Sequence, residues 1–567
     1  MTRRDQPAAA SDRGRTSPVR YLRRIAQPLS TWRHRLCGGR SPASNRSSTT
    51  LTPGFTYDGI KTSAPSCPYK KPVETIREEQ YPHMKDGIYL DHSGTTIYAR
   101  ALIERFAHRL NSSLLGNPHS ANQPAKMSGD MVDEVRAKAL RFLGADPAHY
   151  DLVFVQNATG AIKIVADAFR DLAEQTRSGK FWYGYHRDAH TSIVGVREIA
   201  GDGNHRCFES DAEVEKWLEA HTHGTENIEG LSLFAFPGQS NLTGRRLPLE
   251  WCGRARSARG LKNTYSLLDA AALAMTSPLH RAFSDPETAP DFTCVSFYKI
   301  FGFPDLGGLV VRKDSGHILA LRKYFGGGTV SLVSTIGTAW HVSKGLEATA
   351  AGPDEAEGAH GLHEGLEDGT LPFHSIIALG EAIDVHHELY GSMENISRYT
   401  TQLATRMYEG IISLRYSNGQ PLCKVYREET DVYGDAKRQG ATVAFNVFRK
   451  DGSYESYASV EAAANEKGIY VRSGGICCPG GVFTALRYEP WQLNRAKSAG
   501  HHCGSDGLGV INELPTGVVR ASMGAMSTVK EVDAFLAFLR DTFIGKDIAV
   551  SQDPGSEKVP VAVYSSS

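Results

Sequence analysis

An aspartate and a lysine each close an apolar run of the sequence. Asp269 ends Tyr265-Ser-Leu-Leu-Asp269, and Lys299 ends Phe292-Thr-Cys-Val-Ser-Phe-Tyr-Lys299. A lysine in so apolar a segment tends to lose its proton, because burying its charge is costly. The neutral amine is the form that makes a Schiff base with a carbonyl group. The two residues therefore predict carbonyl chemistry at a lysine, with a carboxylate close by.

A third feature is a turn that could bind phosphate. Asn157-Ala-Thr-Gly160 follows the apolar run 151–155 and precedes a helical pattern. The first turn of a helix offers free N–H groups and the positive end of the helix dipole to a phosphate. Together, the three features are what pyridoxal phosphate needs, since a carboxylate keeps its pyridine nitrogen protonated. The alternatives are a lysine at a sheet edge, a helix-capping aspartate and an ordinary turn; their joint occurrence in this order favours the cofactor.

The elements that must position these residues are short apolar strands alternating with helices from about Tyr89 onward. The predicted strands cover residues 151–155, 231–236, 265–268, 292–297 and 309–311. One face of the helix after Gly160 holds Ile162, Val165, Ala166, Phe169 and Leu172. Continuous apolar strands predict an α/β fold with a mainly parallel sheet covered on both faces. Ligands bind beyond the carboxyl ends of such strands, where Asp269 and Lys299 stand.

The sequence pattern of the C-terminal part predicts a second, smaller domain. Residues 346–370, rich in Gly, Ala and acids, predict a surface loop, and residues 374–390 predict a helix. Thr528 and Glu531 form a capping box before a last helix, whose stripe is Val532, Phe535, Leu536, Leu539 and Phe543. The expected division is a disordered basic extension (1–75), an N-terminal arm of the small domain (76–110), a large cofactor-binding domain (111–384), a small domain with the cysteine loop (385–545) and a tail (546–567).

Composition excludes several classes of function. The 567 residues carry 63 basic and 63 acidic side chains, and no apolar stretch reaches the roughly 20 residues of a membrane helix. Residues 1–50 hold eleven Arg and two Asp, so the rest of the chain is net acidic and has no global field for nucleic acid. The Arg-rich start fits a cytosolic extension or, alternatively, a mitochondrial transit peptide. Nine scattered Cys predict no disulfide framework and a reducing compartment.

Nine motifs in order make the sequence resemble a known family from about Tyr89 to Ile544. The motifs are Tyr89-Leu-Asp-His-Ser-Gly-Thr-Thr96, Gly116-Asn-Pro-His-Ser120, Phe154-Val-Gln-Asn-Ala-Thr159, Asp188-Ala-His-Thr-Ser-Ile-Val-Gly195, Ser296-Phe-Tyr-Lys-Ile-Phe-Gly302, Phe325-Gly-Gly-Gly-Thr329, Glu367-Asp-Gly-Thr370, Arg472-Ser-Gly474 with Cys477, and Thr516-Gly-Val-Val-Arg-Ala-Ser-Met-Gly524. The sequence resembles the class V, fold-type I pyridoxal-phosphate enzymes called cysteine desulfurases. Within them it is most similar to the N-terminal desulfurase domain of eukaryotic molybdenum cofactor sulfurases. The resemblance implies a large domain with a mainly parallel seven-stranded sheet and a smaller α+β domain.

The resemblance also implies roles for cofactor-binding residues. Lys299 would hold pyridoxal phosphate and act as a base, Asp269 would pair with the pyridine nitrogen, and His190 would lie over the ring and assist proton transfer. Asn241 would donate to the phenolic oxygen. The phosphate would be held by Ala158, Thr159 and Ser296, and by Thr329 of a partner subunit, which implies a homodimer.

The implied site differs from that of bacterial relatives at two positions, and it includes one residue that would contact the substrate. Tyr298 stands where many bacterial relatives have His, as in the molybdenum cofactor group, and is expected beside the cofactor. Ala272 replaces a Gln of the bacterial relatives, so contact with the phenolic oxygen would rest mainly on Asn241. Arg520 would bind the substrate carboxylate, a bidentate task that suits a guanidinium group.

The sulfur-carrying residue is expected in Arg472-Ser-Gly-Gly-Ile-Cys-Cys-Pro-Gly480. Cys477 occupies the family's catalytic position, and a thiolate can attack sulfur and keep it as a persulfide. The glycines suit a mobile loop. Two ordinary reduced thiols are the alternative, and Cys478 could instead resolve the persulfide as a disulfide. A metal site with His501-His502-Cys503 lacks zinc-ligand spacing, so no metal is predicted.

The activity implied is conversion of L-cysteine to L-alanine, with the sulfur left as a persulfide on Cys477. It would pass to a sulfur-acceptor protein or to the molybdenum cofactor. Full-length molybdenum cofactor sulfurases carry a C-terminal cofactor-binding domain, and this sequence ends too soon after its last predicted helix to contain one, so a free-standing enzyme or one with a separate partner is expected. The alternatives are selenocysteine lysis, β-elimination or a catalytically silent scaffold.

Overall fold

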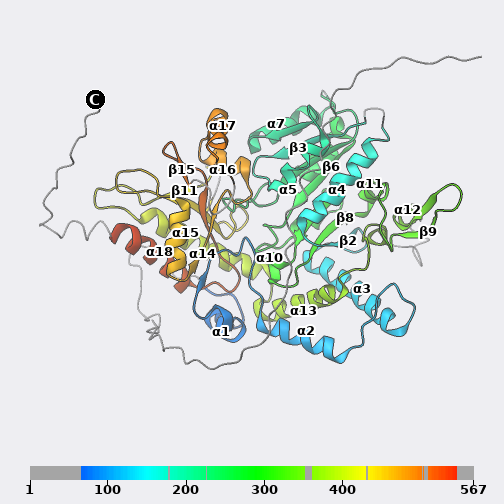
Figure 1. Cartoon of the computed structure of the whole chain (residues 1–567), viewed down its shortest axis with the longest axis horizontal. Coiled ribbons are helices and arrows are strands. Elements are labelled where there is room, and N and C mark those ends of the chain that lie inside the picture. The colour runs from blue at the N-terminus through cyan, green and yellow to red at the C-terminus, as the bar shows by residue number, and fades with distance from the viewer. Residues whose placement is uncertain are drawn as a thin grey trace, which may run out of the picture. The chain divides into compact units, whose positions relative to one another are not determined.

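The computed structural model describes residues 66–545, apart from 177–178, 225, 351–360, 429–431, 501 and 503–508. A seven-stranded sheet, in the order β2-β8-β7-β6-β5-β3-β4, forms its largest layer (Figure 1). The strands are β2 (Tyr150–Val155), β3 (Trp182–His186), β4 (His205–Phe208), β5 (Ser232–Pro237), β6 (Thr264–Asp269), β7 (Phe292–Ser296) and β8 (Gly307–Arg312). Only β8 runs antiparallel to its neighbours within this sheet. The predicted mainly parallel seven-stranded sheet is confirmed.

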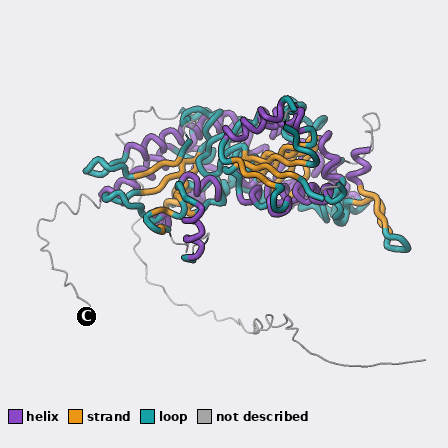
Figure 2. Tube along the Cα trace, turned by 90° about the horizontal axis from the view of Figure 1, so that it is seen from above, coloured by secondary structure: helices purple, strands orange, loops and turns teal. Residues whose placement is uncertain are grey.

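Both faces of this sheet are covered, because successive side chains of its strands point into two different cores. In β2, Phe154 belongs to one core and Val153 to the other. The first core includes α3 (Gln123–Leu143), α7 (Asp211–Thr222) and α8 (Trp251–Ser257); the second includes α4 (Ala158–Ala173) and α11 (Gly316–Ala320). Figure 2 shows the strands of the sheet between helices. Two-sided burial explains why the strands are apolar throughout rather than alternating.

The turn between β2 and α4 is built by two residues. Asn157 caps the helix, since its Oδ1 accepts from the Gly160 N–H at 3.0 Å. Gly307 of β8 packs against the Asn157 backbone so closely that a Cβ there would lie 2.5 Å from Asn157 Cα. Only glycine allows this approach, which fixes the start of α4 at the sheet edge. Of the predicted stripe, Ile162, Val165, Ala166 and Phe169 are buried and Leu172 is half-buried.

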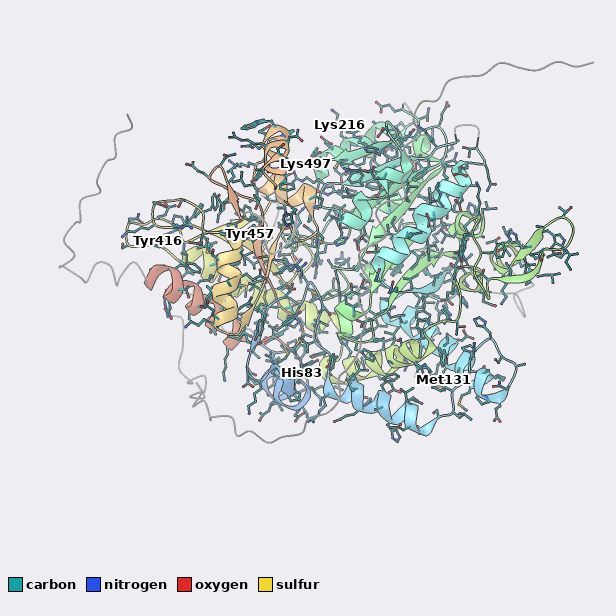
Figure 3. The ribbon with its side chains drawn as sticks, viewed as in Figure 1. His83, Met131, Lys216, Tyr416, Tyr457 and Lys497 are labelled. Atoms are coloured by element: carbon teal, nitrogen blue, oxygen red, sulfur yellow. The ribbon has the colours of Figure 1, made fainter. Side chains whose placement is uncertain are left out.

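A second, four-stranded antiparallel sheet has the order β11-β12-β17-β14. Its strands are β11 (Cys423–Tyr426), β12 (Thr442–Val447), β14 (Arg472–Gly474) and β17 (Val518–Ser522), with helices α14 (Met393–Ser413), α15 (Tyr457–Glu466), α16 (Pro479–Ala485), α17 (Pro490–Ser498) and α18 (Val529–Leu539) near it in the chain. Figure 3 shows Tyr457 and Lys497 in this part of the molecule, and Met131 and Lys216 in the part that holds the larger sheet. The capping box of Thr528 and Glu531 at α18 is confirmed.

The N-terminal segment packs against the elements of the second sheet. Tyr69 is buried and donates to the Ala525 carbonyl at 3.0 Å, and Arg77 of α1 (Val73–Gln80) pairs with Glu531 at 2.7 Å. β1 (Ile88–Tyr89) pairs with β13 (Ile469–Tyr470). Packed structure therefore begins at or before Tyr69, so the predicted end of the basic extension at residue 75 is wrong. The rest of that extension, up to residue 65, and the predicted tail lie outside the described residues.

The expected loop over residues 346–370 is partly wrong. Helix α12 (Lys344–Ala350) and a 3-10 turn (Leu362–Gly365) occupy its two ends, and residues 351–360 lie outside the described part. The Ala and Glu residues that suggested a solvated loop also favour helix. Before α12, β9 (Val330–Ser334) and β10 (Trp340–Ser343) form a hairpin.

The remaining elements are helices, turns and short strands. They are η1 (Pro82–Met84), α2 (Arg100–Ser112), α5 (Thr191–Val194), α6 (Arg197–Ala200), η2 (Arg259–Leu261), α9 (His280–Phe283), α10 (Tyr298–Phe301), η3 (Lys313–Ser315), the predicted helix α13 (Phe373–Tyr390), β15 (Val510–Ile511), β16 (Leu514–Pro515) and a π-helical turn (Arg540–Ile544). Within the described residues, no helix combines the length and apolar character needed to cross a bilayer. The predicted domain boundaries other than that at residue 75 stay predictions.

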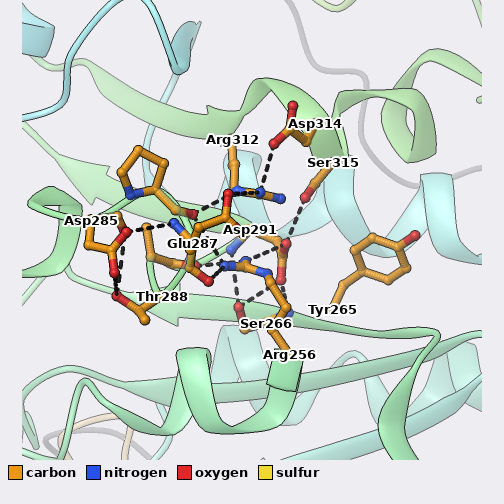
Figure 4. A network of polar contacts seen from close by, with 12 residues as sticks. Arg256, Tyr265, Ser266, Asp285, Glu287, Thr288, Asp291, Arg312, Asp314 and Ser315 are labelled. Atoms are coloured by element: carbon orange, nitrogen blue, oxygen red, sulfur yellow. Dashed lines mark hydrogen bonds and ion pairs between the residues drawn. The ribbon is translucent and has the colours of Figure 1, made fainter. Parts of the chain in front are cut away.

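A buried polar network occupies the edge of the large sheet where β6 and β7 begin (Figure 4). Asp291 accepts from the Ser266 N–H at 2.7 Å, from Arg256 at 2.7 Å and from the Ser315 hydroxyl at 2.6 Å. Its carboxylate is therefore fully partnered, which is typical of a structural buried charge. Chemistry is to be sought at the opposite edge, where the parallel strands end.

Candidate functional site

A cavity lies beyond the carboxyl ends of β5, β6 and β7. It brings together eight of the nine residues predicted to bind the cofactor: Ala158, Thr159, His190, Asn241, Asp269, Ser296, Tyr298 and Lys299. Thr329 is not among the residues that line it; its hydroxyl donates to the Gly326 carbonyl at 2.8 Å, before the β9–β10 hairpin. The positions were assigned from motifs spread over more than 140 residues, and folding places them around one hollow.

The N-terminus of α4 forms one end of this cavity. The Ala158 N–H donates to Ser296 Oγ at 3.2 Å, and the hydroxyls of Thr159 and Ser192 are hydrogen-bonded at 2.8 Å. Three hydroxyls therefore gather at the positive end of a 16-residue helix, a donor set that fits a phosphate group. Ser192 was not singled out in the sequence, although it lies within the motif Asp188–Gly195.

Asp269 and Lys299 line the same cavity from neighbouring strands. Asp269 Oδ1 accepts from the Ala271 N–H at 3.0 Å and from the Cys294 thiol at 3.6 Å, which fixes the carboxylate. Lys299 lies in α10, directly after β7. Burial lowers the pKa of Lys299, Asp269 opposes this shift, and the charge of Arg520 adds to it. A fixed carboxylate, an amine of lowered pKa and a hydroxyl-lined helix start are the groups that pyridoxal phosphate requires, so the residues present fit this cofactor.

His190 connects the cavity to the cysteine loop. It precedes α5, and its Nδ1 accepts from the Ser192 N–H at 3.1 Å. This bond leaves Nε2 to carry the proton of the neutral ring. His190 also hydrogen-bonds Cys477, and this bond is the main cause that lowers the pKa of the Cys477 thiol. The nearby charge of Arg472 lowers it further.

Cys477 stands at the tip of a strained turn. Ile476 and Cys477 have φ of 42° and 57°, in the left-handed region that is costly for a β-branched residue such as Ile476. Two hydrogen bonds hold the turn: Asn241 Nδ2 donates to the Ile476 carbonyl at 2.8 Å, and the Thr191 N–H donates to the Cys477 carbonyl at 3.0 Å. The sequence predicted a mobile loop; in the structure, movement of the tip requires both contacts to break.

The two adjacent cysteines have opposite environments. The Cys477 side chain is exposed, whereas Cys478 is completely buried and its thiol donates to the Asp188 carbonyl at 3.5 Å. Burial raises the pKa of Cys478 well above that of an ordinary thiol. A reactive thiolate is therefore expected at Cys477 alone. No group of three potential metal ligands occurs among the described residues, and His501 and Cys503 lie outside them.

Arg520 lies in β17, buried beside the loop and the cavity. Its Nη1 donates to the Asn241 carbonyl and its Nη2 to Asp91 Oδ1, both at 2.8 Å. Nε is buried and has no partner among the described residues. Burial lowers the pKa of Arg520, and Asp91 opposes that effect. The pairing with Asp91 was not predicted, although Asp91 belongs to the motif that begins at Tyr89.

Gln239 is a second cavity residue that sequence reasoning missed. It lines the wall near Ala272, and its Nε2 donates to the Ala272 carbonyl at 3.2 Å. From the sequence, position 272 shows only an Ala without an amide group. The structure brings an amide side chain to that wall from a different strand end, after β5.

The sequence of the chain matches the family model described as "Aminotransferase class-V" over residues 88–535. The chain belongs to this family. Curated relatives of the chain include the "Molybdenum cofactor sulfurase" of Aspergillus niger, 49% identical over 480 residues, and that of Botryotinia fuckeliana, 47% identical over 504 residues. These alignments cover 85% and 88% of this chain but 55% and 58% of the relatives, so the chain spans little more than half their length.

Solved structures show the same fold as this class V chain. A cysteine desulfurase from Thermococcus onnurineus NA1 has a TM-score of 0.60 at 18% identity, with 83% of this chain and 98% of that one covered. An S-sulfonic acid form of a cysteine desulfurase from Escherichia coli has a TM-score of 0.57, also at 18% identity, with 85% and 99% covered. The predicted fold class, that of the fold-type I pyridoxal-phosphate enzymes, is therefore confirmed.

We expect the pH at which Cys477 reacts with iodoacetamide to reflect its hydrogen bond to His190. A lowered pKa keeps the thiolate present at lower pH, so the midpoint of the rate should lie below that of an ordinary cysteine. His190→Ala removes the stabilising bond, so the midpoint should rise. Peptide mass spectrometry of Cys477 across pH measures it, with His317→Ala, an exposed histidine, as the control. An unchanged midpoint in His190→Ala would contradict the assignment.

Proposed function

We propose that this chain is a pyridoxal-phosphate-dependent L-cysteine desulfurase that forms L-alanine and a persulfide on Cys477. One observation carries the proposal: His190, which lines the cavity that fits the cofactor, also hydrogen-bonds an exposed thiol of lowered pKa, that of Cys477. The names of the curated relatives and of the structural neighbours support it.

The position of each residue in the cavity indicates its role in the proposed reaction. When bound, pyridoxal phosphate supplies an electron sink that stabilises negative charge at the substrate Cα. The α4 N-terminus with Thr159, Ser192 and Ser296 would bind its phosphate, Asp269 would pair with its ring nitrogen, and Lys299 would hold its carbonyl carbon before the substrate binds. Neutral Lys299 takes the Cα proton, a role that its lowered pKa permits. Tyr298 and Asn241 complete the wall of the pocket.

Sulfur transfer follows from the thiolate at Cys477. Its Sγ forms a bond to the substrate sulfur while the substrate C–S bond breaks, and protonation of the remaining carbon skeleton yields alanine. The Cys477 persulfide keeps the sulfur. Arg520 orients the substrate carboxylate. The acceptor is the molybdenum cofactor or a sulfur-carrying protein, in line with the names of the relatives.

A homodimer is part of the proposal. The β9–β10 hairpin directly follows Thr329, and it exposes Leu332, Val333, Ile336 and Trp340, of which Ile336 is 88% exposed. Contiguous exposed apolar side chains of this kind mark an interaction surface. A second copy of the chain seated there would bring Thr329 toward the partner's phosphate site; sedimentation as a monomer would exclude this.

The seven described cysteines are free, which supports a reducing compartment such as the cytoplasm.

The experiment that tests the activity separates it from its rivals by product. The full chain, purified with pyridoxal phosphate, is incubated with a reductant and either L-cysteine or, in a parallel reaction, L-selenocysteine. Alanine and sulfide in equal amounts are expected. Pyruvate and ammonia would indicate β-elimination instead, and alanine formed only from selenocysteine would indicate a selenocysteine lyase. A protein that binds the cofactor but forms none of these products would be a silent scaffold.

A further inference from the structure

A large groove next to the cofactor cavity has no role in the proposed reaction. It runs between the segments that follow β5 and β6, helix α14 and the turn before β12. Its cationic lining residues are Arg245, Arg246, Arg254, Arg256, Arg281, Arg398, Lys437 and Arg438, and its acidic ones are Asp211, Glu250, Glu287 and Glu394. Gly238 lines the groove, whereas Pro237 and Gln239 line the cofactor cavity, so one segment separates the two sites.

Three of the arginines have structural partners. Arg245 pairs with Asp188 and Asp211, Arg254 pairs with Glu215, and Arg256 reaches Asp291 in the network of Figure 4. Two of the acids are also engaged, Glu287 by Arg312 at 3.7 Å and Glu394 by His280 at 3.3 Å. The ion pairs of Arg245, Arg254, Arg256 and Glu287 neutralise these charges locally, whereas the contact with His280 neutralises Glu394 only when the imidazole is protonated.

Five cations remain without an ion pair among the described residues. They are Arg246, Arg281, Arg398, Lys437 and Arg438. All except Arg246 are exposed, and they come from four separate segments of the chain. Like charges that converge from separate segments repel one another unless an anion lies between them. Glu250 is the one acid of the lining left without an ion pair in the described structure.

Arg246 adds an observation of a different kind. Its Nε donates to Gln239 Oε1 at 3.1 Å, and its Nη1 donates to the Ala436 carbonyl and to Ser397 Oγ. Its Nη2 is buried and has no hydrogen-bond partner in the described structure. A buried cationic N–H without an acceptor is unfavourable. Burial lowers the pKa of Arg246 to about 10; the nearby Asp435 opposes this shift, as a bound anion also would, and the charge of Arg281 adds to it.

We propose that this groove binds a small anion that carries two or more phosphate groups. One carboxylate carries too little negative charge to balance five converging cations. A guanidinium group can also donate two parallel hydrogen bonds to two oxygens of one phosphate. The buried Nη2 of Arg246 needs an acceptor small enough to reach it, which favours a compact phosphate over an acidic segment of a protein. Leu247, Leu249 and Pro278 supply apolar wall beside the charges.

The test is calorimetric titration of the cofactor-loaded full chain with inorganic pyrophosphate at low salt. Because the cofactor occupies the phosphate site at α4, pyrophosphate is directed to other cationic sites. The variant R281E/R398E reverses two exposed charges that make no ion pair, so folding should be unaffected. We expect its Kd to rise at least about tenfold, as for the loss of strong phosphate contacts. The matched control R415E/K467E reverses two exposed cations outside the groove and should leave the Kd unchanged.

Three outcomes would overturn the proposal. Wild-type protein that binds no pyrophosphate would exclude the site. An equal rise of the pyrophosphate Kd in the two double variants would show that the anion binds elsewhere, or that it responds only to the overall charge of the protein. A wild-type dimer that R281E/R398E converts to monomers would show that a second copy of the chain covers the groove. Binding is read without turnover, so the result does not depend on the desulfurase proposal.

Discussion

Cys477→Ser should lower alanine formation from L-cysteine by at least about 100-fold, as expected when a nucleophile is lost. A serine hydroxyl is not ionised near neutral pH and lacks the soft sulfur that accepts a sulfur atom. Cys477 is exposed, and His190 lowers its pKa, so its thiolate is available where an ordinary thiol is mostly protonated. The fold should be unaffected, because the side chain packs against little. Binding of pyridoxal phosphate, followed by visible absorption, should remain.

Cys478→Ala is the matched control for this prediction. Cys478 is one residue away but buried in the small core that includes Leu242, Val482 and Val518. Removing its sulfur should leave turnover close to wild type and lower the free energy of unfolding by about 1 kcal/mol. Alanine release is compared for the three proteins, with urea denaturation for stability. Equal loss of turnover in the two variants would move sulfur capture away from Cys477 alone, and loss only in Cys478→Ala would assign it to the buried thiol.

The sequence predicted the sheet well because its strands are buried on both faces and therefore form continuous apolar runs. It did not predict the direction of β8. Only residues 297–306 separate β7 from β8, and a parallel crossover usually needs a dozen or more, so the short connection forces an antiparallel return. Loop length was the signal that could have indicated this.

The cavity residues were predicted where a motif singled them out and missed where the contact depends on packing. Asp269 is the last residue of β6 and Lys299 lies three residues after the end of β7, so their position at the sheet edge is a property of local sequence. Gln239 reaches the wall at Ala272 from another strand end, and no spacing rule connects the two. The contrast between Cys477 and Cys478 is similar, since neighbouring residues of one type differ only through burial, which the complete fold decides.

The strain at Ile476 explains how this contrast serves the proposed chemistry. Left-handed backbone at Ile476 and Cys477 costs about 1–3 kcal/mol per residue, and it turns Cys477 outward while Ile476 and Cys478 stay buried. Asn241 and the Thr191 N–H hold the carbonyls of Ile476 and Cys477. Asn241 lines the cofactor cavity, and Thr191 directly follows His190, which also lines it. The thiol is thus positioned by groups of the cofactor cavity rather than by its own loop.

Lys299→Ala should abolish covalent attachment of pyridoxal phosphate and lower turnover by at least about 100-fold, the smallest effect typical of a lost acid–base group. Burial and the charge of Arg520 lower the pKa of Lys299, so its amine is neutral at lower pH than an ordinary lysine and can bond to the cofactor carbonyl. Asp269 opposes this shift. In Asp269→Asn the opposing charge is gone, so the pKa of Lys299 should fall further and the neutral amine should persist to lower pH.

Borohydride reduction locates the attachment directly. Reduction of the wild-type protein loaded with pyridoxal phosphate should leave a pyridoxyl group on the peptide that contains Lys299, as read by mass spectrometry. Lys299→Ala should carry none, and the exposed Lys313→Ala should be labelled like wild type. A pyridoxyl group on another lysine of the wild type would show that Lys299 does not bind the cofactor covalently. The cofactor would then have to be attached to that other lysine. A label at Lys299 alone, together with unlabelled and inactive Lys299→Ala, would tie the lowered pKa to the chemistry, because the lysine whose pKa burial lowers is then the one that reacts.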